Sequence, residues 1–209
     1  LSNIYGRSNK NIWAVGKSGL MMYYNGVEWK ERRFPLFDGI ANFSAVWISS
    51  AEQGLGWASD ERGRIAILRN DTWESTDQQL SVGMPRNIRS VGESLWLVGT
   101  GGIATKKHAS DRPDWVQYKF PNELPEDKEL FALFPLNEND IWFGGRDGII
   151  LHWDGKSFSK AQSTTNRLIT SMWGASSGDI WAHGEIGVML HWNGKEWSMP
   201  KPLPQTVNG

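Results

Sequence analysis

The stretch DIWAHGEIG, from Asp179 to Gly187, decides the fold class of this chain. It places Gly187 six residues after Trp181, and the same spacing occurs five times. The pairs are Trp13 with Gly19, Trp57 with Gly63, Trp96 with Gly102, Trp142 with Gly148, and Trp181 with Gly187. Successive tryptophans are 44, 39, 46 and 39 residues apart. A period near 40 residues without helical patterning indicates one supersecondary unit copied five times.

The residues around this stretch predict four short strands. Each segment is rich in aromatic and β-branched residues and is bounded by Gly, Asn, Asp or Ser. The segments are 169–177, 179–184, 188–192 and 196–200. Asn193 and Gly194 join the last two segments, and this pair suits a two-residue type I′ turn. The unit is therefore predicted to be a four-stranded antiparallel meander.

The other repeats align with this unit and fill the chain. One such sheet has two apolar faces, and stacking the sheets around an axis buries both. We therefore predict one all-β domain over residues 1–209, a five-bladed β-propeller of four-stranded antiparallel blades. The approximate blades are 1–38, 39–80, 81–122, 123–163 and 164–203. Ring closure would require the first blade to pack against the fifth, and the same repeats also fit a slice of a larger propeller.

The 13 tryptophans all occupy repeat positions. We interpret the five second-strand tryptophans, with the five glycines that follow them, as structural residues that pack between blades. A second set closes the fourth strands, and a solvent-facing indole there would offer a surface for sugar stacking. That set is Trp29, Trp73, Trp115 and Trp197.

Composition excludes several function classes. The net charge is −1 and the pI is about 6.5, so no global field favours nucleic acid. No apolar run approaches the length of a membrane span, so we expect no direct membrane insertion. Cysteine is absent, which removes disulfides and thiolate metal sites. A start at Leu1 fits either processing or cropping of a longer chain.

No motif for catalysis or metal binding is present. The spacing of His108, His152, His183 and His191 matches no metal-ligand pattern, so we expect no metal and no cofactor. A glycosidase would need two carboxylates at a defined separation. Its candidates lie on predicted turns between second and third strands, where acidic residues are ordinary, so we expect no enzyme. They are Asp60, Glu61, Asp147 and Glu185.

Basic residues are predicted to gather on one face of the propeller. The turns between second and third strands share this face with the entries to the first strands. The candidate binding residues are Arg86, Arg89, Lys128 and Arg167 at the entries, and Lys17, Arg62 and Arg146 on the turns. Such a funnel suits carboxylate, sulfate or phosphate groups. Acidic neighbours, among them Glu61 and Glu129, would neutralise part of it.

The third repeat departs most from the others. Its hairpin at 106–114 is longer and more charged than its equivalents, and it adds Lys106, Lys107 and His108 to the candidate binding residues. Irregular loops on a regular scaffold are common places for function.

The repeats resemble those of bacterial secreted and cell-envelope β-propeller proteins. The resemblance is carried by Asp179-Ile-Trp-Ala with His191-Trp-Asn-Gly and Trp197, and by Asp140-Ile-Trp with His152-Trp-Asp-Gly. The segment Asn11-Ile-Trp-Ala-Val-Gly also matches, whereas the second and third repeats depart. The resemblance implies an extracytoplasmic setting, meaning secreted, periplasmic or cell-surface, and it implies no activity.

We therefore predict a non-catalytic extracytoplasmic binding or scaffold module with a protein or glycan partner. One alternative is a lectin of the five-bladed propeller type, with sugar sites repeated between blades. A second alternative is a glycosidase-like enzyme. Repeated sites would favour the lectin, and carboxylates that converge at the axis would favour the enzyme.

Overall fold

The computed structural model describes residues 1–32, 34, 40–49, 55–80, 82–107, 115–118 and 129–200. Within these ranges the regular structure is twenty β-strands and three 3-10 turns, without an α-helix. The strands form five four-stranded sheets, each antiparallel and in chain order. The prediction of an all-β fold built from five four-stranded meanders is confirmed. No helix in the described ranges is long and apolar enough to cross a membrane.

Each sheet is called a blade here, and the blades are numbered in chain order. Blade 1 is β1 (Asn3–Ser8), β2 (Asn11–Val15), β3 (Met21–Tyr24) and β4 (Trp29–Glu31). Blade 2 is β5 (Phe43–Ile48), β6 (Gly56–Asp60), β7 (Arg64–Arg69) and β8 (Thr72–Gln79). Blade 3 is β9 (Pro85–Val91), β10 (Ser94–Gly99), β11 (Gly102–Lys107) and β12 (Val116–Tyr118).

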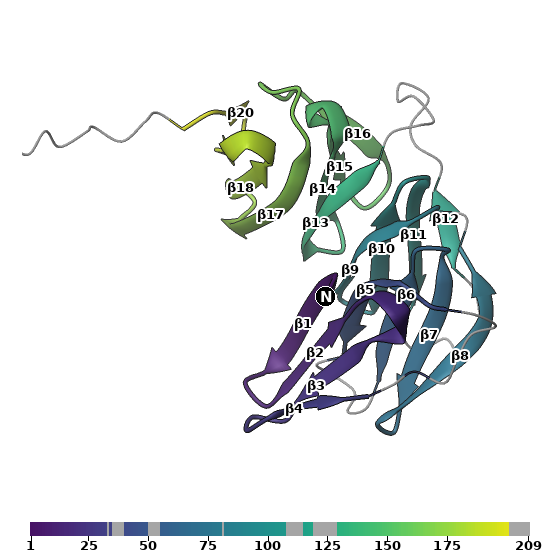
Figure 1. The fold of residues 1–209 in the computed structure, drawn as a ribbon. Coiled ribbons are helices and arrows are strands. Elements are labelled where there is room, and N and C mark those ends of the chain that lie inside the picture. Colours follow the sequence, from purple (N-terminus) through teal and green to yellow (C-terminus); the bar gives the residue numbers. More distant parts are fainter. Residues whose placement is uncertain are drawn as a thin grey trace, which may run out of the picture.

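The last two blades repeat the pattern most regularly. Blade 4 is β13 (Leu130–Asn137), β14 (Asp140–Gly145), β15 (Ile150–Trp153) and β16 (Phe158–Ala161). Blade 5 is β17 (Ile169–Ser176), β18 (Asp179–Gly184), β19 (Met189–Trp192) and β20 (Trp197–Ser198). The blades follow one another along an arc, which starts with β1 and ends with β17–β20 (Figure 1).

The turn between the second and third strands explains the spacing of tryptophan and glycine. The glycine that follows each tryptophan by six residues sits in this turn, or in blade 3 at the first residue of β11, with a positive φ that glycine adopts without a steric cost. The values are 74° at Gly19, 77° at Gly63, 147° at Gly102, 67° at Gly148 and 71° at Gly187. In blades 1, 4 and 5 the turn is a 3-10 turn: η1 (Lys17–Gly19), η2 (Arg146–Gly148) and η3 (Glu185–Gly187).

Backbone hydrogen bonds tie these turns to the chain that enters the first strand. Three equivalent N–H groups donate to the residue just before that strand in the same blade. They are Glu61 to Asn42 at 2.9 Å, Arg146 to Glu129 at 3.0 Å, and Glu185 to Leu168 at 2.9 Å. The turns and the strand entries therefore lie on one face of the molecule, called the entry face here.

We predict that Gly148→Ala destabilises the protein more than Gly187→Ala. Both glycines have positive φ, so alanine costs about 1–2 kcal/mol of backbone strain at either position. A Cβ at Gly148 would also collide with the backbone oxygen of Thr165, whereas a Cβ at Gly187 meets nothing within 4 Å. We expect about 2–4 kcal/mol for Gly148→Ala. Urea denaturation of both variants measures the difference, and equal midpoints would contradict the contact.

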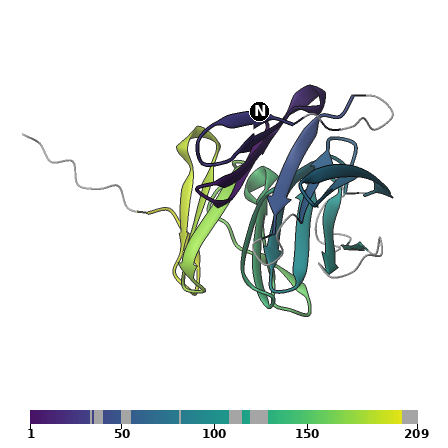
Figure 2. The ribbon, with the colours of Figure 1, turned by 90° about the horizontal axis from the view of Figure 1, so that it is seen from below.

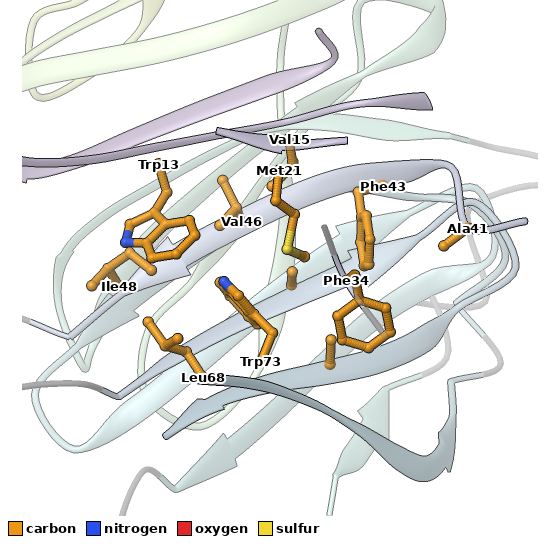
Figure 3. Close-up of a cluster of buried hydrophobic side chains, with 12 residues drawn as sticks. Trp13, Val15, Met21, Phe34, Ala41, Phe43, Val46, Ile48, Leu68 and Trp73 are labelled. Carbon is orange, nitrogen blue, oxygen red and sulfur yellow. The ribbon is translucent and has the colours of Figure 1, made fainter. Parts of the chain in front are cut away.

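The blades pack through one repeated contact. The second-strand tryptophan of a blade meets the closing tryptophan at the start of the fourth strand of the next blade, which in blade 3 directly precedes that strand. The rings lie edge to face in the pairs Trp13–Trp73 (5.5 Å, 83°), Trp57–Trp115 (6.1 Å, 88°) and Trp142–Trp197 (5.5 Å, 74°). Figure 3 shows the first pair within the cluster between blades 1 and 2.

The third interface departs from this rule. Blade 4 closes with Phe158 instead of tryptophan, and Phe158 packs on Trp153 at 4.7 Å. Trp96 of blade 3 then lies 5.6 Å from Trp153 and stacks on Tyr118 at 5.9 Å. A second aromatic residue thus replaces the missing indole.

Ring closure is not confirmed. The described residues form four hydrophobic clusters, one between each pair of consecutive blades, and none of them joins blade 5 to blade 1. Seen from below, the blade 5 strands stand at one edge of the molecule, with blade 4 beside them (Figure 2).

Candidate functional site

Two of the predicted binding residues meet on the entry face, across the interface between blades 3 and 4. Arg86 belongs to β9, and Arg146 is the first residue of η2. The Glu129 carboxylate lies between them, with Oε2 at 2.7 Å from Arg146 Nε and at 4.0 Å from Arg86 Nη2. Both guanidinium groups lie over the Phe131 ring, at 4.7 Å for Arg86 and 6.0 Å for Arg146. These four residues are called the arginine cluster.

The cluster holds two cations and one anion, so it keeps a net positive charge. Glu129 neutralises part of the basic face, as expected from the sequence. Its carboxylate is mostly buried, whereas Arg146 is more than half exposed. The Nε atom of Arg86 is buried and has no hydrogen-bond partner among the described residues. The Phe131 ring and Glu129 hold the two planar guanidinium groups in place, which suits bidentate binding of a further carboxylate or phosphate.

Arg89 is not part of this cluster. It lies on β9 opposite Trp96, and its Nη1 donates to the Ile88 carbonyl at 2.9 Å. Its guanidinium carbon lies 5.8 Å from the centre of the Tyr5 ring. Burial lowers the pKa of the Arg89 guanidinium, and Tyr5 partly opposes this effect. Arg89 therefore connects blades 3 and 1 inside the arc rather than presenting a charge at the entry face.

The other candidates are spread over the entry face or lie outside the described residues. Lys17, Arg62 and Arg167 are exposed there, and within the described ranges no hydrogen bond or ion pair joins them to the arginine cluster. Lys128 and His108 fall outside the described residues. Lys106 and Lys107 end β11, and only their backbone is described. The charged hairpin of blade 3 thus stays a prediction.

A cavity of about 290 Å³ lies on the entry face between blades 1 and 2. Its polar groups largely satisfy one another. Asn42 accepts from the Ser18 backbone N–H at 3.1 Å, and its Nδ2 donates to Glu61 Oε2 at 3.1 Å. The other lining residues are Ile40, Asp60 and Arg62. The cavity carries both signs of charge and is less suited to an anion than the arginine cluster.

Asp60 is accounted for by its own partners. It is only 1% exposed, and it accepts from Arg64 Nε at 2.8 Å and from Arg64 Nη2 at 2.6 Å. It also accepts the backbone N–H groups of Arg62 and Arg64 at 3.0 and 2.9 Å. The glycosidase candidate with the most unusual position therefore holds a turn together. Of the other three, Glu61 bonds Asn42, and Asp147 and Glu185 lie on separate 3-10 turns.

A repeated arrangement of aspartate, tryptophan and histidine was not predicted from the sequence. In blade 4, Asp140 Oδ1 accepts from Trp142 Nε1 at 2.8 Å and lies 2.8 Å from His152 Nε2. The imidazole stacks on the indole at 4.3 Å. The sequence motif Asp-x-Trp followed by a later His contains all three residues. Their contact depends on the pairing of β14 with β15, which places His152 opposite Trp142.

Blade 5 repeats this arrangement with Asp179, Trp181 and His191, at 3.1 and 2.9 Å. Each carboxylate satisfies one indole and one imidazole, so the arrangement is structural in form. In the described ranges no group of three or more His, Cys, Asp or Glu side chains is placed to hold a metal ion.

Comparison with known proteins supports the fold. A scan of protein-family models finds no match, and neither does a search of curated proteins. Among solved structures, the chain is similar to YCF48 bound to D1 peptide, with a TM-score of 0.68 and 17% identity over 93% of this chain. It is also similar to YCF48 from Cyanidioschyzon merolae, with a TM-score of 0.68 and 14% identity over 92% of this chain.

A third similar structure is the extracellular domain of the putative one component system BT4673 from B. thetaiotaomicron, with a TM-score of 0.73 and 17% identity over 95% of this chain. The chain has a β-propeller-like fold. It spans 66%, 70% and 27% of the lengths of these three chains, in the order given. At such low identities the likeness shows the β-propeller-like fold and no shared activity.

Proposed function

We propose that this chain is a non-catalytic, extracytoplasmic protein-binding module whose arginine cluster takes an acidic group of the partner. The observation that carries the proposal is the placement of Arg86 and Arg146 on one aromatic ring with a single carboxylate between them. A partner carboxylate would complete the charge balance and offer an acceptor to guanidinium N–H groups.

The similar structures support this proposal. One YCF48 structure is bound to a peptide, and the BT4673 domain is extracellular. Both features fit a β-propeller-like chain that binds a protein outside the cytoplasm. That the chain has no enzyme activity is also a proposal.

The closing tryptophans give little support to a lectin with sugar sites repeated between blades. Two of the four closing tryptophans, Trp73 and Trp197, are buried between blades, and Trp115 is half-buried and donates to Gln78 at 2.9 Å. A set of equivalent stacking platforms is therefore not present on these strands. A glycan array tests the lectin alternative directly, and binding to it would contradict the protein-binding proposal.

We predict that Arg86→Ala with Arg146→Ala weakens binding of an acidic peptide at least tenfold. Charge-assisted hydrogen bonds contribute about 1.5–3 kcal/mol each, and about 1.4 kcal/mol is a factor of ten. The probe is an array of peptides that end in a free carboxylate and carry Asp or Glu nearby, followed by fluorescence anisotropy of the peptides that bind. Binding should also weaken with added salt, because exposed charges are screened.

The matched control is Lys17→Ala with Arg167→Ala, which removes two charges from the entry face outside the cluster. It should reduce binding only slightly. If the control weakens binding as much as the cluster variant, general charge attracts the peptide and the specific site is wrong. The proposal would also be contradicted if none of the acidic peptides on the array bound the protein.

A further inference from the structure

The first strands carry a set of equivalent positions that differ sharply in exposure. The residue paired with the second-strand tryptophan is Tyr5, Trp47, Arg89, Phe134 or Trp173 in blades 1 to 5. Trp47 is 1% exposed because blades 1 and 3 enclose it. Trp173 has the same side chain at the same register and is 65% exposed.

The whole side of blade 5 that points away from blade 4 shares this exposure. The other four second-strand tryptophans are 3–4% exposed, whereas Trp181 is half-buried. Met189 on the neighbouring strand is 47% exposed. Trp173, Trp181 and Met189 are called the trailing face. It is the same surface that every other blade buries against its successor.

Blade 1 has the converse surface uncovered. Ile4 is 59% exposed, whereas its equivalents on the other first strands are at most 8% exposed. Those equivalents are Val46, Ile88, Leu133 and Met172. The closing tryptophan Trp29 is 44% exposed, against 4% for Trp73 and 3% for Trp197. Ile4 and Trp29 are called the leading face.

The two faces are the two halves of the interface that recurs inside the arc. The trailing face presents a second-strand tryptophan without a closing tryptophan on it. The leading face presents a closing tryptophan without a second-strand tryptophan beneath it. We propose that each face binds a further blade of this same repeat, carried on the same polypeptide, so that the five blades are part of a larger ring.

Two observations favour this occupant over others. Each face matches a surface that another blade of this protein already presents, since three interfaces pair the equivalent tryptophans edge to face. The YCF48 structures that the chain resembles are also longer than it, since it spans 66% and 70% of them. A blade joined by a short connection would in addition meet its face at a high effective concentration.

The test extends the chain at its C-terminus with a second copy of residues 1–80, which carries two blades and a leading face. Oxidative footprinting with mass spectrometry measures modification of Trp173 in the extended and the original chain. We expect at least fivefold less modification of Trp173 in the extended chain, together with a monomeric mass by light scattering. The control extension carries Ile4→Asp and Trp29→Asp in the added copy only, and it should leave Trp173 as reactive as before.

Three results would overturn the proposal. Protection of Trp173 in the original monomeric chain would mean that blade 5 closes on blade 1. Protection that grows with concentration in the original chain would mean that a second copy is the occupant. Equal reactivity in the extended and control chains would mean that the face accepts no blade of this repeat. None of these results affects the arginine cluster, which lies at the interface of blades 3 and 4.

Discussion

Trp142→Ala is expected to lower the free energy of unfolding by about 3–5 kcal/mol, as large core truncations do. The Trp142 side chain is 4% exposed and packs between blades. Its ring lies 4.9 Å from Trp192 and 5.5 Å from Trp197, both in the next blade. Truncation leaves a cavity that these strands cannot fill, and it also removes the indole partner of Asp140. Urea denaturation followed by circular dichroism measures the loss.

Trp181→Ala provides the matched control at the same register. From the sequence alone the two tryptophans are expected to be equally important. The structure separates them, because no blade of the described residues covers Trp181 and less apolar surface is lost when it is removed. We expect less than half the destabilisation of Trp142→Ala. An equal loss would show that the trailing face is covered in solution.

Arg64→Met is expected to destabilise the protein by about 3–5 kcal/mol, the cost of leaving a buried charge uncompensated. Asp60 is almost fully buried, and the Arg64 guanidinium binds it through two nitrogens. Methionine keeps most of the side-chain length but removes both donors. The measurement is again the urea midpoint, with the slope checked so that a change in unfolding cooperativity is not mistaken for a change in stability.

The double variant Asp60→Gly with Arg64→Met should recover part of this loss, although it also removes the Asp60 hydrogen bonds to the backbone of the turn. It removes both charges and gives position 60 the residue of the other blades, which have Gly16, Gly99, Gly145 and Gly184 there. Recovery would show that Arg64 serves mainly to neutralise Asp60. A double variant as unstable as Arg64→Met would show that the turn needs the Asp60 hydrogen bonds to the Arg62 and Arg64 backbone, or that Arg64 acts through a further contact such as the one to the Ile40 carbonyl at 3.3 Å.

The local structure could be predicted from the sequence because it depends on residues close together in the chain. Gly148, which has a positive φ, and Trp142 belong to one hairpin, and the residues of that hairpin also determine the type of its turn. Because the sequence pattern repeats five times, the strands predicted for one repeat could be assigned to the other four. Asp60 was noticed as a departure from glycine, but its partner Arg64 was not, because the two side chains meet only once the turn is formed.

The arginine cluster could be predicted only in part. Arg86 and Arg146 were recognised as basic residues of one face, and Glu129 as a neutralising neighbour. Their meeting on Phe131 depends on the angle between blades 3 and 4, which no local pattern encodes. Closure of the ring could not be predicted from the sequence for the same reason. The repeat pattern predicts which surfaces of neighbouring blades pack together. The number of blades in a closed ring depends on the rotation angle between one blade and the next.

The hydrogen bonds between the turns and the strand entries have a consequence for how this surface changes during evolution. The bonds use backbone atoms only, so they hold the turn in place whatever side chain follows the second strand. Equivalent positions already carry Glu61, Arg146 and Glu185 within one chain. Substitution there alters the charge of the face without disturbing its frame. The scaffold thus offers several equivalent positions at which point mutations can change the charge of the entry face while the backbone stays in place.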